Sequence, residues 1–408
     1  MAAADAVREL RNIRDIVNLF YEGPDAVFQF LTQHGLIMES MLCDKCLPLD
    51  GPVDCDIDVE MSLFRRNNEL RWRCKARHER TIRHHSEFFT WEHGTTANGR
   101  NNSNRLSLEQ MLILTWCWCW DNSPESAAQN AACSIVSALS HYSQCRRVCY
   151  AALDDREACP EAGLMGGPGH LVQIDECSVK ARRKRAANGR GRLGPGDLQE
   201  PHRGTPEEQA ALADGTAVDA VEEEEEEEEE VDETEEGGEE EGDNDEPAGW
   251  VFGMVWWRSL EEKRQRIPQE TRFFSVQKRD AETLLNLIRS HVAPGTQIWS
   301  DCWRAYMGID QLPEGYIHLT VNHSEFYTDD TTGVNTNAIE AAWNRLRHNI
   351  CRTKRGVGKE LSFHLAELWW KSLQHVPRPS RNGRTNRTFR NSHIFMNFLD
   401  LIRRVYAL

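Results

Sequence analysis

Residues 171–179 have the sequence LVQIDECSV, an apolar β-strand pattern with an acidic residue, Asp175, at its centre. A carboxylate flanked by Val172 and Ile174 is costly to bury unless it is paired or bound to a metal ion. A second apolar segment, GWVFGMVWW, follows at 249–257. We expect the two segments to form one hairpin whose turn is enlarged by the residues between them.

The segments after this hairpin alternate between strand and helix patterns. Strands are predicted at 271–279, 296–301 and 316–324, and helices at 281–292, 302–308 and 335–350. Three strands as hairpins, followed by helix, strand, helix, strand and helix, predict an α/β (α+β) fold. In such a fold helices pack on a mixed sheet.

The formal net charge of −17 is concentrated in one segment. Residues 197–247 are a low-complexity acidic tract with nine consecutive glutamates, and we expect it to be disordered. The tract carries −24, so the rest of the chain carries +7. A basic body suits DNA as a partner, although a charge of that size is also found in proteins that bind no nucleic acid.

The ends and the cysteines indicate the compartment. The chain has no run of about 18 apolar residues, and its N-terminus alternates charged and apolar residues as an amphipathic helix does. We therefore expect an intracellular protein without a transmembrane helix. Its thirteen cysteines are then predicted to be thiols or metal ligands rather than disulfides.

Three acidic residues lie in or at the end of predicted elements, at positions where their side chains can meet. Asp175 lies in one strand, Asp301 ends another, and Glu340 lies on a helix. Carboxylates converging at one edge of a sheet can hold two Mg²⁺ ions about 3.5–4 Å apart for an in-line phosphoryl displacement. A structural alternative remains open. Asn337 and Glu340 also match a capping box, and Asp301 could cap the helix after it.

The helix that carries Glu340 has two faces. Its polar stripe and its apolar stripe recur at spacings of three and four residues. The polar stripe is Asn337, Glu340, Asn344 and Arg347, and the apolar stripe is Ile339, Ala342, Trp343, Leu346 and Ile350. We expect the apolar stripe to pack on the sheet, so that Glu340 can hold metal while Arg347 meets a DNA phosphate.

At these residues the chain resembles the ISXO2-like transposase family, which is related to the Merlin DNA transposons. The matching segments are IDECSVKARRKRAANGRGR, GWVFGMVWW, AETLLNLIRSHVAPGTQIWSDCWRAY and GYIHLTVNHSEFYTDDTTGVNTNAIEAAWNRLR. They follow in the family's order and span roughly residues 170–372, apart from the acidic insert, which departs from the family pattern.

The resemblance implies an RNase H-like fold and a DDE active site that uses Mg²⁺ or Mn²⁺. Asp175 matches the first acid, in the I-D-E strand. Asp301 matches the second, in S-D-x-W. Glu340 matches the third, in T-N-x-I-E-x-x-W, and Arg347 matches the basic residue that follows it. Asn337 is a second candidate for the third position, but Glu340 is preferred because a charged ligand binds Mg²⁺ better than a neutral amide.

Two further residues match the family's V-N-H-S segment. Asn322 and His323 are expected to support the site near the metals or the DNA. A structural role for the histidine is an equal alternative.

The N-terminal region contains a set of zinc-type ligands. Cys43 and Cys46 form C-x-x-C, and Cys74 and His78 begin 28 residues further on. Such spacings suit tetrahedral Zn²⁺, and family members often open with a zinc ribbon followed by W-x-C. Cys55 competes with His78 for the fourth position, and a ribbon that has lost its metal is the other alternative.

Two regions are predicted to contact DNA. Residues 105–155 resemble the family's helix-turn-helix, in which Arg146 and Arg147 could contact phosphates; an ordinary three-helix bundle is the alternative. The basic run, Lys180, Arg182, Arg183, Lys184 and Arg185, could contact DNA or serve as a nuclear localisation signal. The polyglutamate suggests a eukaryotic source and hence the nucleus; in a prokaryote the cytoplasm or nucleoid is expected.

These predictions divide the chain into modules. They are N-terminal amphipathic helices at 1–38, a zinc-ribbon-like module at 39–92, a helix-turn-helix-like region at 105–155, an RNase H-like domain at 168–372 interrupted by the insert 197–247, and a basic tail with a helix at 373–408. The predicted function is transposition of DNA by a homo-oligomer that binds terminal inverted repeats and target DNA. The alternatives are a domesticated DNA-binding protein without catalysis and a nuclease that cuts without joining.

Overall fold

The structure is a computed structural model, and it describes residues 8–46, 59–67, 69–90, 106–155, 157–179, 249–264, 268–322, 333–347, 360–378, 387–390 and 393–406. The predicted acidic tract at 197–247 and the basic run at 180–185 lie outside these residues. Within the described part of the chain, no helix is long and apolar enough to cross a membrane.

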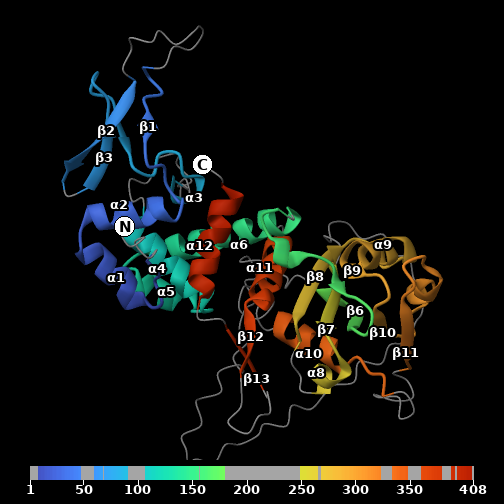
Figure 1. The fold of residues 1–408 in the computed structure, drawn as a ribbon. Helices are drawn as coiled ribbons and strands as arrows, with labels where there is room; N and C mark the ends of the chain where they lie inside the picture. Colours follow the sequence, from blue (N-terminus) through green and yellow to red (C-terminus); the bar gives the residue numbers. More distant parts are fainter. Residues whose placement is uncertain are drawn as a thin grey trace, which may run out of the picture. The chain divides into compact units, whose positions relative to one another are not determined.

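Helices from both ends of the chain bury one shared apolar core (Figure 1). They are α1 (Ile13–Tyr21), α2 (Pro24–Gln33), α3 (Glu87–Thr90), α4 (Leu108–Cys119), α5 (Pro124–Asn130), α6 (Ile135–Asp154), α11 (Leu361–Leu373) and α12 (Ile394–Val405). Trp118 of α4 stacks on Trp370 of α11 at 5.9 Å and meets Phe398 of α12 at 4.6 Å between ring centroids. The three helical segments predicted as separate modules therefore share their buried surface.

Side-chain caps fix where several of these helices begin. Asn12 and Ser107 form capping boxes at α1 and α4, and Ser123 and Ser134 accept backbone N–H groups at α5 and α6. Residues 131–134 join α5 to α6, which is the turn length of a helix-turn-helix.

A small antiparallel sheet precedes α3. Its strands are β1 (Met41–Leu42), β2 (Glu60–Arg66), β3 (Glu69–Arg73) and β4 (Glu79–Thr81), hydrogen-bonded in that order. Met41, Met61 and Trp72 bury a minor core together with Cys43 and Cys74. The predicted zinc ligands thus lie in the turns next to these strands, since Cys43 follows β1, Cys74 follows β3 and His78 precedes β4.

The central sheet has the order β11-β10-β6-β7-β8. Its strands are β6 (Leu171–Val179), β7 (Gly249–Trp257), β8 (Glu270–Val276), β10 (Gln297–Asp301) and β11 (Ile317–Val321). β6, β7 and β8 are antiparallel neighbours, whereas β10 and β11 run parallel to β6. The mixed α/β fold is therefore confirmed, and this strand order is that of an RNase H-like domain.

Helices cover both faces of the central sheet (Figure 1). α10 (Asn337–Leu346) and α11 bury one face, whose core includes Trp299, Ile339 and Trp343. α9 (Ala281–His291) buries the opposite face with Val172, Ile174 and Phe252. α11 contacts both β8 and α6, so this helix joins the sheet to the helical core.

The remaining elements are short. They are η1 (Pro160–Ala162), β5 (Met165–Gly166) paired with β9 (Val292–Ala293), α8 (Leu260–Arg264), η2 (Arg304–Tyr306), η3 (Ile309–Gln311), and β12 (His375–Arg378) paired with β13 (Arg387–Arg390). The helix predicted at 302–308 is reduced to the 3₁₀ turn η2. Trp303 is extended, at φ −61° and ψ 131°, and Gly308, a poor helix former, follows the turn.

Candidate functional site

Asp175 and Asp301 are neighbours on two parallel strands. The register of β6 and β10 pairs Gln173 with Trp299, and the two aspartates lie two residues further along each strand. Side chains alternate between the faces of a strand, so both carboxylates share the face of Gln173 and Trp299. Adjacent strands are about 4.8 Å apart, so backbone pairing brings together two aspartates that are 126 residues apart in the sequence.

Glu340 reaches the same face from above. α10 packs across β6 and β7, with Ile339, Trp343 and Leu346 buried against the sheet. Glu340 is half-buried and Arg347 is exposed on the polar side of the helix. The two stripes expected for this helix are thus present; Ile350, the last residue of the apolar stripe, lies outside the described residues.

The carboxylate of Asp175 is largely buried and is held by two hydrogen bonds. Trp343 Nε1–H donates to Oδ2 at 2.7 Å, and the backbone N–H of Glu176 donates to Oδ1 at 2.8 Å. Burial raises the pKa of Asp175 to about 6, the indole N–H opposes that rise, and the charges of Asp301 and Glu340 add to it. The three predicted acids therefore interact electrostatically in one site.

A glycine makes room for the Trp343 ring. Gly253 pairs directly with Asp175 across β6 and β7. A Cβ at this position would lie 2.5 Å from Trp343 Cη2 and 2.9 Å from Ile339 Cδ1. Carbon atoms pack at about 3.5–4.0 Å, so the indole can reach the Asp175 carboxylate only because residue 253 has no side chain.

Gln173 fixes the start of α10. Its Oε1 accepts the N–H groups of Ala338 at 3.2 Å and Ile339 at 3.3 Å, and its Nε2 donates to the Asn335 carbonyl at 2.6 Å. The side chain is fully buried, and the first N–H groups of a helix otherwise lack acceptors. A residue of the strand that bears Asp175 thus positions the helix that bears Glu340.

Neither capping role considered for the acids is observed. Asp301 Oδ1 accepts the Trp303 N–H at 2.9 Å, which closes a local turn, but the N-cap of η2 is Trp303 and no side chain caps this 3₁₀ helix. The capping box at Asn337 and Glu340 does not form, because the N-cap of α10 is Thr336 and Asn337 is already helical. The Thr336 hydroxyl instead donates to Glu340 Oε1 at 2.8 Å, and Asn337 is exposed one turn before Glu340.

The donor chemistry of this site fits hard divalent cations, which prefer carboxylate oxygens. Within the described part of the chain, the side chains grouped closely enough to share an ion are those of a cysteine–histidine cluster, and the three carboxylates do not form such a group. Mutual repulsion keeps like charges apart, and a cation between them would offset it. Asp175, Asp301 and Glu340 are the residues that would hold such ions.

Glu176 is an acid that sequence reasoning passed over. It follows Asp175 and therefore faces the other side of the sheet, beside Tyr306. Burial raises its pKa to about 7; the Tyr306 hydroxyl opposes the rise, and the charges of Asp175 and Asp301 add to it. The two adjacent acidic residues of the I-D-E segment are the sequence feature that could have indicated Glu176.

Arg347 lies along the same face as the acids. Its Nη2 donates to the sulfur of Cys177 at 3.2 Å, and Cys177 is two residues beyond Asp175 on β6. Arg347 therefore contacts the strand that bears Asp175 and is exposed to solvent.

The arginines of α6 are engaged in structural contacts, and the phosphate contact expected of Arg146 does not hold. Arg146 is 7% exposed and lies 3.7 Å from Glu367. Arg147 pairs with Glu360 at 2.8 Å and stacks on Phe363 at 4.3 Å. Packing of α11 on α6 buries Arg146, whereas Arg147 stays partly exposed. Lys180, Arg182, Arg183, Lys184 and Arg185 lie outside the described residues.

Asn322 lies at the same edge of the sheet as the acids. It is exposed and follows Val321, which pairs with Asp301 across β10 and β11. His323 lies outside the described residues.

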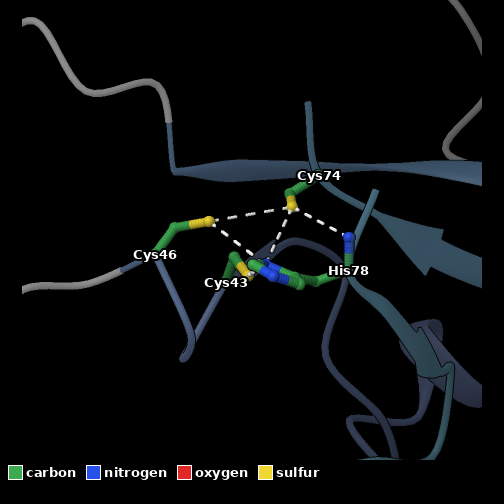
Figure 2. A group of neighbouring side chains, drawn as sticks. All are labelled: Cys43, Cys46, Cys74 and His78. Carbon is green, nitrogen blue, oxygen red and sulfur yellow. Dashed lines mark hydrogen bonds between the residues drawn. The ribbon is translucent and has the colours of Figure 1, made fainter. Parts of the chain in front are cut away.

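The predicted zinc ligands gather into one cluster, Cys43, Cys46, Cys74 and His78 (Figure 2). His78 Nδ1 lies 3.5 Å from the Cys43 sulfur, 3.3 Å from the Cys46 sulfur and 3.6 Å from the Cys74 sulfur. The sulfurs of Cys46 and Cys74 are 3.8 Å apart. Ideal tetrahedral bonds to zinc imply edges of about 3.8 Å between sulfurs and about 3.6 Å from sulfur to nitrogen.

Two turns bring the four ligands together. The Cys46 N–H donates to the Cys43 carbonyl at 3.0 Å, and the Arg77 N–H donates to the Cys74 carbonyl at 2.9 Å. The His78 N–H also donates to the Cys74 sulfur at 3.3 Å, which favours a thiolate. The cluster can bind a zinc ion with His78 as its fourth ligand; Cys55 lies outside the described residues.

The family assignment comes from a match to residues 224–372 by the model of the ISXO2-like transposase domain. These residues belong to the ISXO2-like transposase family. The matched part contains β7 to β11, α10 and most of α11, with Asp301, Asn337 and Glu340. Asp175 precedes the match, so its place in the transposase domain rests on its pairing with β7 and β10.

Two solved structures share a low similarity with this transposase-like chain. The Mos1 strand transfer complex is 9% identical over 65% of this chain and 76% of the other, and a pre-cleavage Mos1 transpososome is 10% identical over 64% and 76%. Both TM-scores are 0.16, at which the likeness carries no conclusion. No curated protein matches the chain.

Proposed function

We propose that this transposase-like protein cleaves DNA strands and transfers them to target DNA with divalent metal ions held by Asp175, Asp301 and Glu340. The observation that carries the proposal is the placement of two aspartates at one level of adjacent parallel strands, with Glu340 on the helix that crosses them. The electrostatic coupling of Asp175 to both other acids supports it.

The side chains around the acids have definable tasks. Bound Mg²⁺ or Mn²⁺ would activate the attacking oxygen and stabilise the leaving oxygen of a phosphodiester. Trp343 orients the Asp175 carboxylate, and Gln173 sets the position of α10 and hence of Glu340. Arg347, exposed on the same face, is suited to a DNA phosphate. Asn337 remains a second candidate ligand one turn away.

The cysteine–histidine cluster is proposed to hold structural Zn²⁺. Four ligands without an open position are typical of structural zinc, because catalytic zinc keeps one position for water. The small sheet β1–β4 buries few apolar side chains, so metal binding would contribute much of its folding free energy.

DNA with terminal inverted repeats is the proposed partner, and a homo-oligomer is the proposed active form. The nucleus is the proposed location, supported by the basic run at 180–185 in the sequence.

The test uses oligonucleotides with the inverted repeats that flank the gene, incubated with full-length protein and Mg²⁺ or Mn²⁺. Cleavage and joining are expected for the wild type, and loss of both for Asp175→Ala, Asp301→Ala and Glu340→Ala. Asn337→Ala should keep activity if Glu340 is the third ligand. Specific DNA binding by the wild type without metal-dependent cleavage would overturn the proposal and favour a domesticated DNA-binding protein.

A further inference from the structure

Two tryptophans and an arginine form a stack beside Asp301, which we call the Trp–Arg stack: Trp250, Arg279 and Trp303. The guanidinium carbon of Arg279 lies 3.8 Å from the ring centre of Trp250 and 4.7 Å from that of Trp303. The indole N–H of Trp303 also donates to the Arg279 carbonyl at 3.4 Å. Within the stack, Trp303 is thereby held by two contacts with Arg279, one with its guanidinium and one with its carbonyl oxygen.

Trp303 remains open to solvent although it is held. It is 39% exposed, whereas Trp250 and Arg279 are half-buried. A large aromatic surface outside the core is a candidate contact for a ligand. Because neighbouring groups already hold the ring, a ligand that stacks on it would cost little side-chain entropy.

The stack is joined directly to one of the proposed catalytic acids, Asp301, while its Trp250 packs with the opposite face of the sheet. The backbone N–H of Trp303 donates to Asp301 Oδ1 at 2.9 Å. Lys278 and Arg304, both exposed, flank the stack in sequence and add positive charge. A nucleic acid strand bound at Asp301 would therefore pass within reach of an indole face and several cations.

We propose that Trp303, braced by Arg279 and Trp250, stacks on an unpaired base of the DNA strand that is cleaved at Asp175 and Asp301. Every base has a π-face that stacks on aromatic rings, but a base within a duplex has both faces covered, so the target must be unpaired or flipped out. The inference rests on the proposed function and deepens it by naming the form of DNA that the site takes.

The test measures DNA binding by the zinc-loaded full-length protein without added Mg²⁺, by fluorescence anisotropy. The probes are a 20-nucleotide oligothymidine and a 20-base-pair duplex. Trp303→Ala should weaken binding of the single strand about 5- to 150-fold, the effect of one lost stacking contact, and change duplex binding less than about twofold. Trp303→Phe should retain most of the affinity, whereas Trp303→Leu should resemble alanine.

Two controls separate stacking from charge and from folding. Met307→Ala removes another exposed apolar side chain, 63% exposed and outside the stack, and should leave both affinities unchanged. The dependence of single-strand affinity on salt should keep its slope in Trp303→Ala, because no cation is lost.

Equal affinity of Trp303→Ala and wild type for the single strand would overturn the inference, as would equal losses for both probes. A cleavage assay distinguishes this failure from failure of the proposed function. If Trp303→Ala cleaves DNA normally with metal and binds the single strand as the wild type does, only the stacking proposal is refuted. If Trp303→Ala weakens binding of the single strand selectively but the wild type never cleaves DNA, the proposed catalysis fails and the stacking stands.

Discussion

Gly253→Ala tests the link between packing and the first catalytic acid. The added Cβ would lie 2.5 Å from Trp343 Cη2 and 2.8 Å from Cζ2, so the ring must retreat by about 1 Å to reach ordinary contact. That shift stretches the 2.7 Å hydrogen bond to Asp175 beyond the usual range. Asp175 then loses the donor that orients it.

The magnitude follows from two costs. Overpacking a core costs about 1–3 kcal/mol, and losing a hydrogen bond to a charged group costs about 1.5–3 kcal/mol. The two are not additive, because one movement of Trp343 relieves the first and causes the second. We expect a loss of about 2–4 kcal/mol, or about 4–16 °C in Tm for a domain of 150–250 residues, and roughly 100-fold slower cleavage.

The assay compares thermal unfolding and Mn²⁺-dependent strand cleavage in three variants. Trp343→Phe removes the N–H without adding an atom, so it should lose activity with a smaller change in Tm. Gly163→Ala is the matched control, because its Cβ meets only the Pro160 carbonyl oxygen at 3.5 Å. If Gly253→Ala unfolds and cleaves like Gly163→Ala, the reasoning about Trp343 and Asp175 is refuted.

Four further predictions follow from the same geometry. Gln173→Leu leaves the N–H groups of Ala338 and Ile339 without their acceptor, so it should cost about 1–3 kcal/mol in denaturant unfolding and slow cleavage; unchanged values would contradict its role. In metal-free protein the folded pKa of Asp175, about 6, exceeds its ordinary value of 3.8. The contribution of Asp175 to the free energy of unfolding is therefore fully present below about pH 4 and is lost as the pH rises to about 6. Asp175→Asn should flatten this pH dependence, and identical profiles of wild type and variant would refute the prediction. Chelation of zinc should unfold β1–β4 and release one zinc ion per chain, measured by elemental analysis. Cys74→Ser should likewise unfold the sheet and lose the zinc, whereas Cys133→Ser should retain it. Arg347→Ala should weaken DNA binding and reduce the slope of log affinity against log salt concentration by about one. An unaltered slope would exclude a phosphate contact.

The elements of the transposase domain could be predicted because their patterns are local. The strand at 171–179, the strand ending at Asp301 and the two stripes of α10 are each visible within about ten residues of sequence. The zinc cluster could be predicted for a related reason, since the spacing of Cys43 and Cys46 and of Cys74 and His78 is set by short turns. The convergence of the acids required the family resemblance as well, because strand order is not a local property.

The residues that support the site could not be predicted, because their roles depend on contacts across the sheet. Gln173 looks like an ordinary polar residue in a strand until α10 places N–H groups above it. Gly253 gains its meaning from the indole opposite it. The phosphate contact expected of Arg146 was wrong for the same reason, since the packing of α11 against α6, distant in sequence, buries it beside Glu367.

The most direct test of the central claim is anomalous scattering from crystals of the full-length protein soaked in Mn²⁺. We expect two peaks about 3.5–4 Å apart, ligated by Asp175, Asp301 and Glu340, and their loss in Asp301→Asn. Mn²⁺ peaks elsewhere only, with these carboxylates remaining apart and unligated, would contradict the two-metal site.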